Sequence, residues 1–520
     1  MEKENSQGRV IKNTIILYGR MVITIGVSLY STRLVLNALG AVDFGIYNLI
    51  AGIIVMLSFL NSAMSTSTQR YLSYYQGKKD ESMQRKVFSN SLILHIIIGL
   101  SIVGMLELGS LFIFDGILNI PLNRLEAAKN IYHFMSVAVF FTIVAVPFSG
   151  LLISHENIVW VALINIIETL IKLGIAIGLY YISKDKLITY GCSMALISAI
   201  SLVIYLIICL NKYKECTIKV YKDYDKPIIK ELGFFASWNL FGALCSVGKT
   251  QGLAIILNVF LGTLVNAAYG IANQVSAQMN FFSSAMLQAL NPQIMKSEGA
   301  GDRSKMLKLS MAGSKFAFFL LAFIAIPAIF EIKNILELWL KNVPPYTVTF
   351  CQLILIGIMT NQLTIGLQSA LQATGKIKTY QTVVGGVQLL TIPLAFLLLK
   401  LGLPDYSVLV GLIVIEFIAC ILRIYFLHKI AGLSISEYLY KVILKEVIPV
   451  IVSVSICWLI VQYIQVEYRF LLTFAVSIFF FFVAVYFFGL SNEEKNQVKT
   501  LIKNKLLSNG KVKSILVETR

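Results

Sequence analysis

The feature that most constrains this chain is a succession of apolar stretches, each roughly 20 residues long, separated by short charged segments. A helix needs about 20 mostly apolar residues to cross the hydrocarbon core of a bilayer. Charged residues make up only 14% of the 520 residues and hydrophobic residues 57%, whereas a soluble domain has roughly 25% charged residues. The sequence therefore predicts an all-α polytopic membrane protein, and none of its segments has the alternating pattern of a membrane β-barrel.

Division of the apolar stretches at the charged segments predicts about fourteen transmembrane helices. An even number of crossings places both termini on one side. Most of the 44 Lys and Arg then fall on that side, as in the run from Gln69 to Lys86 and in the tail after Ser491. Because cytoplasmic loops are enriched in these residues, we expect both termini to be cytoplasmic. The net charge of +17 then follows from topology and from attraction to anionic lipid, without nucleic acid as a partner.

The polar ends and the cysteines add limits to this prediction. The N-terminal segment lacks a small-residue cleavage site, which favours an uncleaved first helix over a signal peptide. The seven cysteines form no Cys-x-x-Cys pair and the four histidines form no HExxH motif, so we expect no disulfide framework, no metal and no cofactor. Ser434-x-x-Glu437 and Ser491-x-x-Glu494 resemble capping boxes, which predict short helices on the membrane surface.

The two halves of the chain resemble each other. At an offset of 222 residues the first predicted helix falls on the seventh, Gly40 falls on Gly262, and Gly77 falls on Gly299. Six predicted helices separate the copies, which predicts two lobes related by an axis along the membrane normal, as in parallel-repeat transporters. The predicted units are an N-lobe (1–215), a basic linker (216–231), a C-lobe (232–430), an interfacial helix with the last two spans (431–490) and a basic tail (491–520).

Charged residues within the spans are candidates for substrate contact, because a charge at the bilayer centre costs about 2.5–3.5 kcal/mol and usually faces a cavity. The repeat predicts Arg20 and Lys249 on facing walls of one central cavity, and Arg33 and Lys172 are further cationic candidates. Polar stripes on predicted helices 1, 2, 7 and 8 would line the same cavity: Thr24, Ser28, Ser58, Ser62, Ser246, Thr250, Asn273, Asn280 and Ser284.

Two acidic residues are candidates for coupling transport to H+ or Na+. Glu168 lies four residues before Lys172 on one helical face, a spacing at which opposite charges pair. Glu416 lies near the middle of the twelfth predicted helix. A purely structural ion pair explains Glu168 and Lys172 equally well.

Enzyme functions fit the sequence poorly. The segment Gly242–Thr250, GALCSVGKT, lies one residue out of register with a phosphate-binding loop, and an apolar helix precedes it where that loop needs a strand. A membrane glycan polymerase or ligase is the more serious alternative. Such enzymes usually need a sizeable outer loop, whereas the longest predicted one, about 331–348, has under 20 residues. We therefore expect no catalytic residues.

The segment Ser31–Asp80 contains Arg33, Leu39-Gly40, Asp43, Gly45-Ile46-Tyr47 and Thr68-Gln69-Arg70-Tyr71-Leu72. With these residues it resembles the bacterial polysaccharide-transport family of Wzx-type O-antigen flippases, in the MOP superfamily with the lipid II flippases and the MATE exporters. The resemblance implies a multi-pass protein of the bacterial inner membrane. It would move undecaprenyl-diphosphate-linked oligosaccharide for lipopolysaccharide, capsule or exopolysaccharide between leaflets, in contact with membrane lipid and other polysaccharide-assembly proteins.

A MATE-like, cation-coupled multidrug exporter is the alternative that this superfamily offers. Exporters of cations need buried carboxylates in their lobes, and the interiors of predicted helices 1, 2, 7 and 8 carry none. The same helices carry Arg20 and Lys249. A cationic cavity suits a pyrophosphate, because Arg offers a fork of donors to oxyanions and Lys a point charge. The flippase is therefore the favoured hypothesis.

Overall fold

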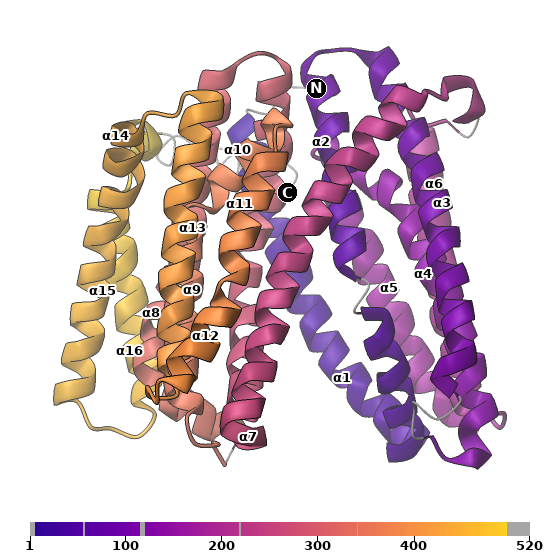
Figure 1. Ribbon diagram of the computed structural model, residues 1–520, viewed down its shortest axis with the longest axis horizontal. Helices are drawn as coiled ribbons and strands as arrows, with labels where there is room; N and C mark the ends of the chain where they lie inside the picture. Colours follow the sequence, from indigo (N-terminus) through magenta and orange to yellow (C-terminus); the bar gives the residue numbers. More distant parts are fainter. Residues whose placement is uncertain (1–5, 56–57, 115–119, 218–219, 341, 497–520) are drawn as a thin grey trace, which may run out of the picture.

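The computed structural model describes residues 6–55, 58–114, 120–217, 220–340 and 342–496, and the regular structure in this part is helical (Figure 1). Eleven of its helices are long and apolar enough to cross a membrane. The number is twelve if α9 (Thr347–Gln362) and α10 (Ile365–Thr374), which meet at a bend of 42°, count as one span. The prediction of an all-α polytopic membrane protein is confirmed.

Two of the longest helices contain a turn at a glycine. In α1 (Ser6–Val55) Gly40 has a φ of 80°, and in α7 (Lys226–Gly299) Gly262 has a φ of 81°, a region that only glycine enters without strain. The Tyr269 hydroxyl donates to the Thr250 carbonyl at 3.3 Å although 19 residues separate them, so the chain folds back at Gly262. The sequence predicts two spans in each of these helices, and the total of fourteen spans stays a prediction.

The helices form two lobes, which lie side by side (Figure 1). The N-lobe holds α1, α2 (Ser58–Gly77), α3 (Glu81–Phe112), α4 (Leu125–Ser154), α5 (Ile158–Gly178) and α6 (Lys186–Lys212). The C-lobe holds α7, α8 (Arg303–Leu340), α9, α10, α11 (Lys378–Leu389), α12 (Thr391–Lys400) and α13 (Ser407–Ala431). Each lobe has buried apolar clusters of its own, as expected where helices bury one stripe against their neighbours.

The last helices, α14 (Ile435–Tyr438), α15 (Leu444–Tyr463) and α16 (Arg469–Ala484), pack on the outer side of the C-lobe (Figure 1). An ion pair between Arg469 and the fully buried Glu331 of α8, at 2.9 Å, fixes α16 there. The predicted capping box at Ser491 is complete, since Ser491 and Glu494 bond each other's amides. At Ser434 only the N-cap bond forms, because the Ser434 hydroxyl accepts from the Glu437 amide while the Glu437 carboxylate pairs with Lys441.

The lobes meet where α2 and α7 end, and we call this the junction end. A Cβ atom on Gly77 would lie 2.1 Å from the carbonyl oxygen of Lys296, and one on Gly299 would lie 2.0 Å from the carbonyl oxygen of Tyr74. Gly77 and Gly299 are 222 positions apart, as are Tyr74 and Lys296. The sequence repeat therefore relates the two contacts, and the junction has twofold pseudo-symmetry. Only glycine permits two backbones to approach this closely.

Polar side chains also cross from one lobe to the other at the junction end. Arg70 of α2 donates to the carbonyl of Ala373 in the last turn of α10, at 3.2 Å. Lys296 and Gln293 of α7 bond the carboxylate of Glu156 after α4, at 2.7 and 3.1 Å. Away from this end the two lobes diverge (Figure 1), so in the described conformation they are joined at the junction end.

Candidate functional site

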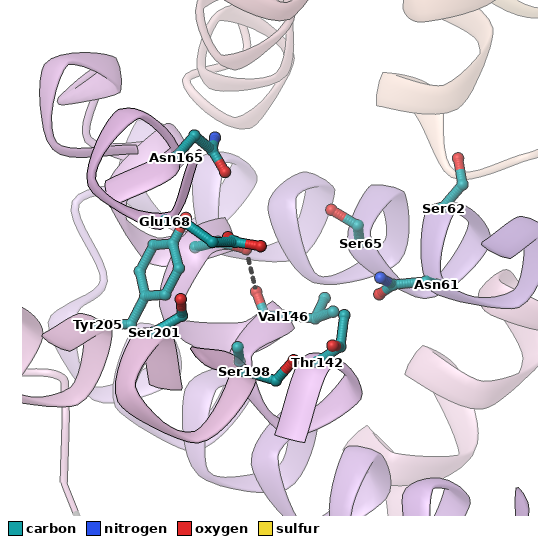
Figure 2. A pocket seen from close by; sticks show the side chains of 12 residues that line it. Asn61, Ser62, Ser65, Thr142, Val146, Asn165, Glu168, Ser198, Ser201 and Tyr205 are labelled. Atoms are coloured by element: carbon teal, nitrogen blue, oxygen red, sulfur yellow. Dashed lines mark hydrogen bonds between the residues drawn. The ribbon is translucent and has the colours of Figure 1, made fainter. Parts of the chain in front are cut away.

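A polar pocket lies inside the N-lobe, between α2, α4, α5 and α6. Its volume is about 430 Å³, within the range of about 300–1,000 Å³ that is typical of ligand sites. Figure 2 shows Asn165, Glu168 and Tyr205 on one side of it and Asn61 and Ser65 on the other. The lining residues recur every three or four positions and so share one face of each helix: Asn61, Ser62, Ser65, Thr142, Ala145, Val146, Ser149, Asn165, Glu168, Ser198, Ser201 and Tyr205.

Three charged residues form a cluster at this pocket, which we call the N-lobe cluster: Arg20, Glu168 and Lys172. The Lys172 amine and the Glu168 carboxylate pair at 2.7 Å, and their side chains are 42% and 28% exposed. Arg20 and Glu168 both interact electrostatically with Tyr205. Two cations and one carboxylate leave one net positive charge in the membrane interior, next to a cavity that can admit water or ligand.

A second group, the C-lobe cluster, has the same charges and different surroundings. It contains Lys249 of α7 with Glu416 and Arg423 of α13. Lys249 forms an ion pair with Glu416, and the two side chains are only 12% and 5% exposed. Asn361 donates to the second oxygen of Glu416 at 2.9 Å. The carboxylate thus has a partner at each oxygen, as a buried charge requires.

Arg423 completes the C-lobe cluster at the break between α9 and α10. Its guanidinium donates to the Thr364 hydroxyl at 3.1 Å and to the Asn361 carbonyl at 3.5 Å, and the residue is 3% exposed. A bend in a membrane helix releases backbone carbonyls that need new donors. Arg423 supplies donors here, and the cluster again has one net positive charge.

The structure places Arg20 and Lys249 in different lobes, and facing walls on one shared cavity stay a prediction. Arg20 interacts with Tyr205 in the N-lobe, while Lys249 is held by Glu416 in the C-lobe. The repeat relates the turns at Gly40 and Gly262. The acidic partner of Lys249 comes from α13, so the ion pair holds the amine within the C-lobe. Arg33 is exposed on α1, beyond Thr24 toward the turn at Gly40.

The predicted polar lining separates into residues with different surroundings. Ser62 lines the N-lobe pocket. Asn280 accepts from Gln362 of α9 at 3.3 Å, and Asn273 bonds Tyr269 one turn earlier on α7. The side chain of Ser58 lies outside the described residues.

The remaining predicted lining residues lie on the same two long helices. Three hydroxyls donate within their own helix, those of Thr24 at 3.1 Å, Thr250 at 3.1 Å and Ser284 at 2.8 Å. Ser28 and Ser246 are exposed. Because the three bonded hydroxyls satisfy their hydrogens locally, they remain available only as acceptors in this conformation.

Sequence reasoning missed most of the pocket and one of the three residues of the C-lobe cluster. The polar residues of α4 and α6, such as Thr142 and Ser201, were not among the predicted lining, although they recur with helical spacing. Arg423 lies eight residues from the end of α13. An arginine at such a position commonly extends its charged group to the membrane interface, so the sequence does not mark it as a cluster residue. Asn361 carries a weak signal, since it stands just before the break at Leu363 and Thr364.

The arrangement of the helices is shared with solved membrane transporters. The fold matches solved MATE and MOP structures: a MATE protein in the straight conformation (14% identity, TM-score 0.69, covering 82% of this chain and 96% of that one), a MOP superfamily transporter from Pyrococcus furiosus (13%, 0.70, 82% and 95%) and an outward-facing MATE multidrug resistance transporter (13%, 0.68, 81% and 95%). At these identities the likeness establishes the fold alone. The comparison with curated protein sequences gave no match.

The family is established by sequence. A profile of the polysaccharide biosynthesis protein family matches residues 10–298, more than half of the chain. The chain therefore belongs to this family, and its multi-pass helical fold is the one found in solved MATE and MOP structures. The resemblance seen in Ser31–Asp80 is confirmed.

Proposed function

We propose that the chain is a flippase that moves undecaprenyl-diphosphate-linked oligosaccharide from the inner to the outer leaflet. The observation that carries the proposal is that a member of this family holds, in each lobe, two membrane-embedded cations for one carboxylate. A surplus positive charge in the membrane is unfavourable unless it serves a charged ligand. A pyrophosphate headgroup is a ligand of matching charge.

In the proposed mechanism Arg20 and Lys172 hold the pyrophosphate beside the N-lobe pocket, next to the lining residues Tyr205 and Glu168. Lys249 and Arg33 act on the same headgroup in other conformations of the cycle, Lys249 only once its pair with Glu416 has opened. The lipid tail stays in the bilayer. The lobes separate at the junction end and join at the other end, which exposes the headgroup to each leaflet in turn.

Coupling to H+ or Na+ is part of the proposal, with Glu168 and Glu416 as the candidate groups. Glu168 is the better placed of the two, because it lines the pocket and its side chain is 28% exposed. Glu416 is enclosed by Lys249 and Asn361 and would exchange an ion only when that arrangement opens. We place the protein in the bacterial inner membrane with both termini cytoplasmic, which makes the junction end the cytoplasmic end.

Deletion of the chain tests the function. Lipid-linked oligosaccharide should accumulate with its glycan facing the cytoplasm, and the surface polysaccharide should be lost. Purified protein in liposomes should then expose a lipid-linked oligosaccharide to a membrane-impermeant glycosidase added outside. Unchanged surface glycan together with raised drug sensitivity would contradict the flippase and support the second candidate, a MATE-like exporter, which the shared fold favours.

A further inference from the structure

We propose that the N-lobe pocket is a subsite for one neutral or amino-bearing sugar ring of the translocated glycan. The inference rests on the proposed function and adds to it where the glycan lies and which sugars it can contain. The polar stripes of α1 and α7 do not form this subsite. It is built instead from α2, α4, α5 and α6, all within one lobe.

The pocket wall is rich in hydrogen-bond acceptors. The hydroxyls of Thr142, Ser149 and Ser198 donate to carbonyls of their own helices at 2.9, 3.0 and 3.2 Å. A hydroxyl that donates in this way still has lone pairs to accept with. The Asn61 side-chain oxygen is buried and, among the described residues, has no hydrogen-bond partner. Sugar hydroxyls are donors that fit such a wall.

The charge of the wall limits the kind of sugar. Glu168 is the one residue with a formal charge among the described residues that line the pocket. A carboxylate beside it would be repelled, whereas a sugar hydroxyl, an acetamido group or an amine would be attracted. The two cations do not line the pocket but interact with residues that do: Lys172 pairs with Glu168, and Arg20 interacts with Tyr205. The pyrophosphate and the sugar therefore have adjoining places.

The size of the pocket also favours a sugar ring. A volume of about 430 Å³ lies at the small end of the range for ligand sites, which suits one ring with its substituents rather than a whole repeat unit. It is far larger than a single desolvated cation needs. The other part of the glycan would extend out of the pocket toward the region between the lobes.

Binding of simple glycosides tests the subsite. The full chain in nanodiscs is mixed with the methyl glycosides of galactose, N-acetylglucosamine and glucuronic acid, and saturation-transfer NMR reports binding. The neutral glycosides should bind and the glucuronide should not. Ser198→Leu fills the pocket and should weaken binding about tenfold or more, equivalent to about 1.4 kcal/mol.

The matched control is Ser193→Leu. Ser193 lies on α6, is half-buried like Ser198, bonds its own helix at 2.8 Å and is not a lining residue. It should bind the glycosides as the unmodified chain does. If Ser198→Leu does not fold, as judged by its thermal unfolding, Asn61→Ala on the opposite wall replaces it and should also weaken binding.

The outcomes separate the subsite from the proposed function. Equal binding by the unmodified chain and both pocket variants, or a preference for the glucuronide, overturns the subsite. Failure of the deletion strain to accumulate lipid-linked oligosaccharide overturns the flippase instead. Binding that appears only for Na+ and for no glycoside, with Glu168→Gln abolishing it, would show that the pocket is a cation site.

Discussion

The two lobes contain the same set of charges in opposite environments. In the N-lobe, Glu168 lines a pocket of about 430 Å³ and pairs with Lys172, and the two side chains are 28% and 42% exposed. In the C-lobe, the side chains of Lys249 and Glu416 are 12% and 5% exposed, and Asn361 donates a hydrogen bond to the second carboxylate oxygen of Glu416. A repeated backbone can therefore place the same charged residue types in an open site in one lobe and in a closed one in the other. The N-lobe cluster is arranged to meet a ligand, and the C-lobe cluster is arranged to hold helices together.

The largest expected effect distinguishes the two clusters by stability. Glu416→Gln leaves Lys249 buried without a counter-charge, which should lower the free energy of unfolding by about 3–5 kcal/mol. Glu168→Gln leaves Lys172 partly hydrated and should cost under about 1 kcal/mol. Thermal unfolding of the purified variants in one detergent measures both. Equal losses in the two lobes would show that the C-lobe pair is not buried as described.

The junction end should respond equally from either lobe. Gly299→Ala places a methyl group against the Tyr74 carbonyl, and Gly77→Ala does the same at Lys296. Overpacking of this kind costs about 1–3 kcal/mol, so both variants should shift the population toward molecules that are open at this end. Spin-label distances across the junction report the shift. Gly270→Ala, where no atom lies within 4 Å of the new methyl group, should change nothing.

A smaller effect concerns Arg124, which lies at the opposite end of the N-lobe. It bonds Asp43 at 2.7 Å and Asp185 at 2.6 Å, and the hydrogen bond from Arg124 lowers the pKa of Asp185, against burial, which raises it. A lowered carboxylate pKa stabilises the fold at pH values above the ordinary pKa of 3.8. This stabilisation is lost as the pH falls below 3.8 and the carboxylate becomes protonated. Arg124→Ala should cost about 1 kcal/mol at neutral pH.

The pH dependence provides the check on that prediction. Unfolding temperatures measured from pH 3 to 7 should converge for Arg124→Ala and the unmodified chain at the acid end, because protonated Asp185 no longer profits from the guanidinium. A constant difference over the whole range would contradict the assignment to Asp185.

The fold could be predicted from the sequence because the patterns that indicate it are local. Apolar length predicts membrane helices, and Gly40 with Gly262 and Gly77 with Gly299 recur at one offset because each pair meets the same backbone demand. The site depended on contacts that no local pattern encodes. Lys249 and Glu416 are 167 positions apart, and nothing in α7 indicates which helix supplies the counter-charge. Polar residues of α4 and α6 look like ordinary helix residues until packing brings them to one pocket.

The most direct test of the account compares pyrophosphate binding between the lobes. Isothermal calorimetry with inorganic pyrophosphate is carried out on the unmodified chain, on Arg20→Ala and on the double variant Lys249→Met with Glu416→Met. The double variant removes the buried pair as a unit, which often leaves stability unchanged. Arg20→Ala should weaken binding about tenfold or more, while the double variant should bind nearly as the unmodified chain does. Loss of binding in the double variant with retention in Arg20→Ala would contradict this expectation.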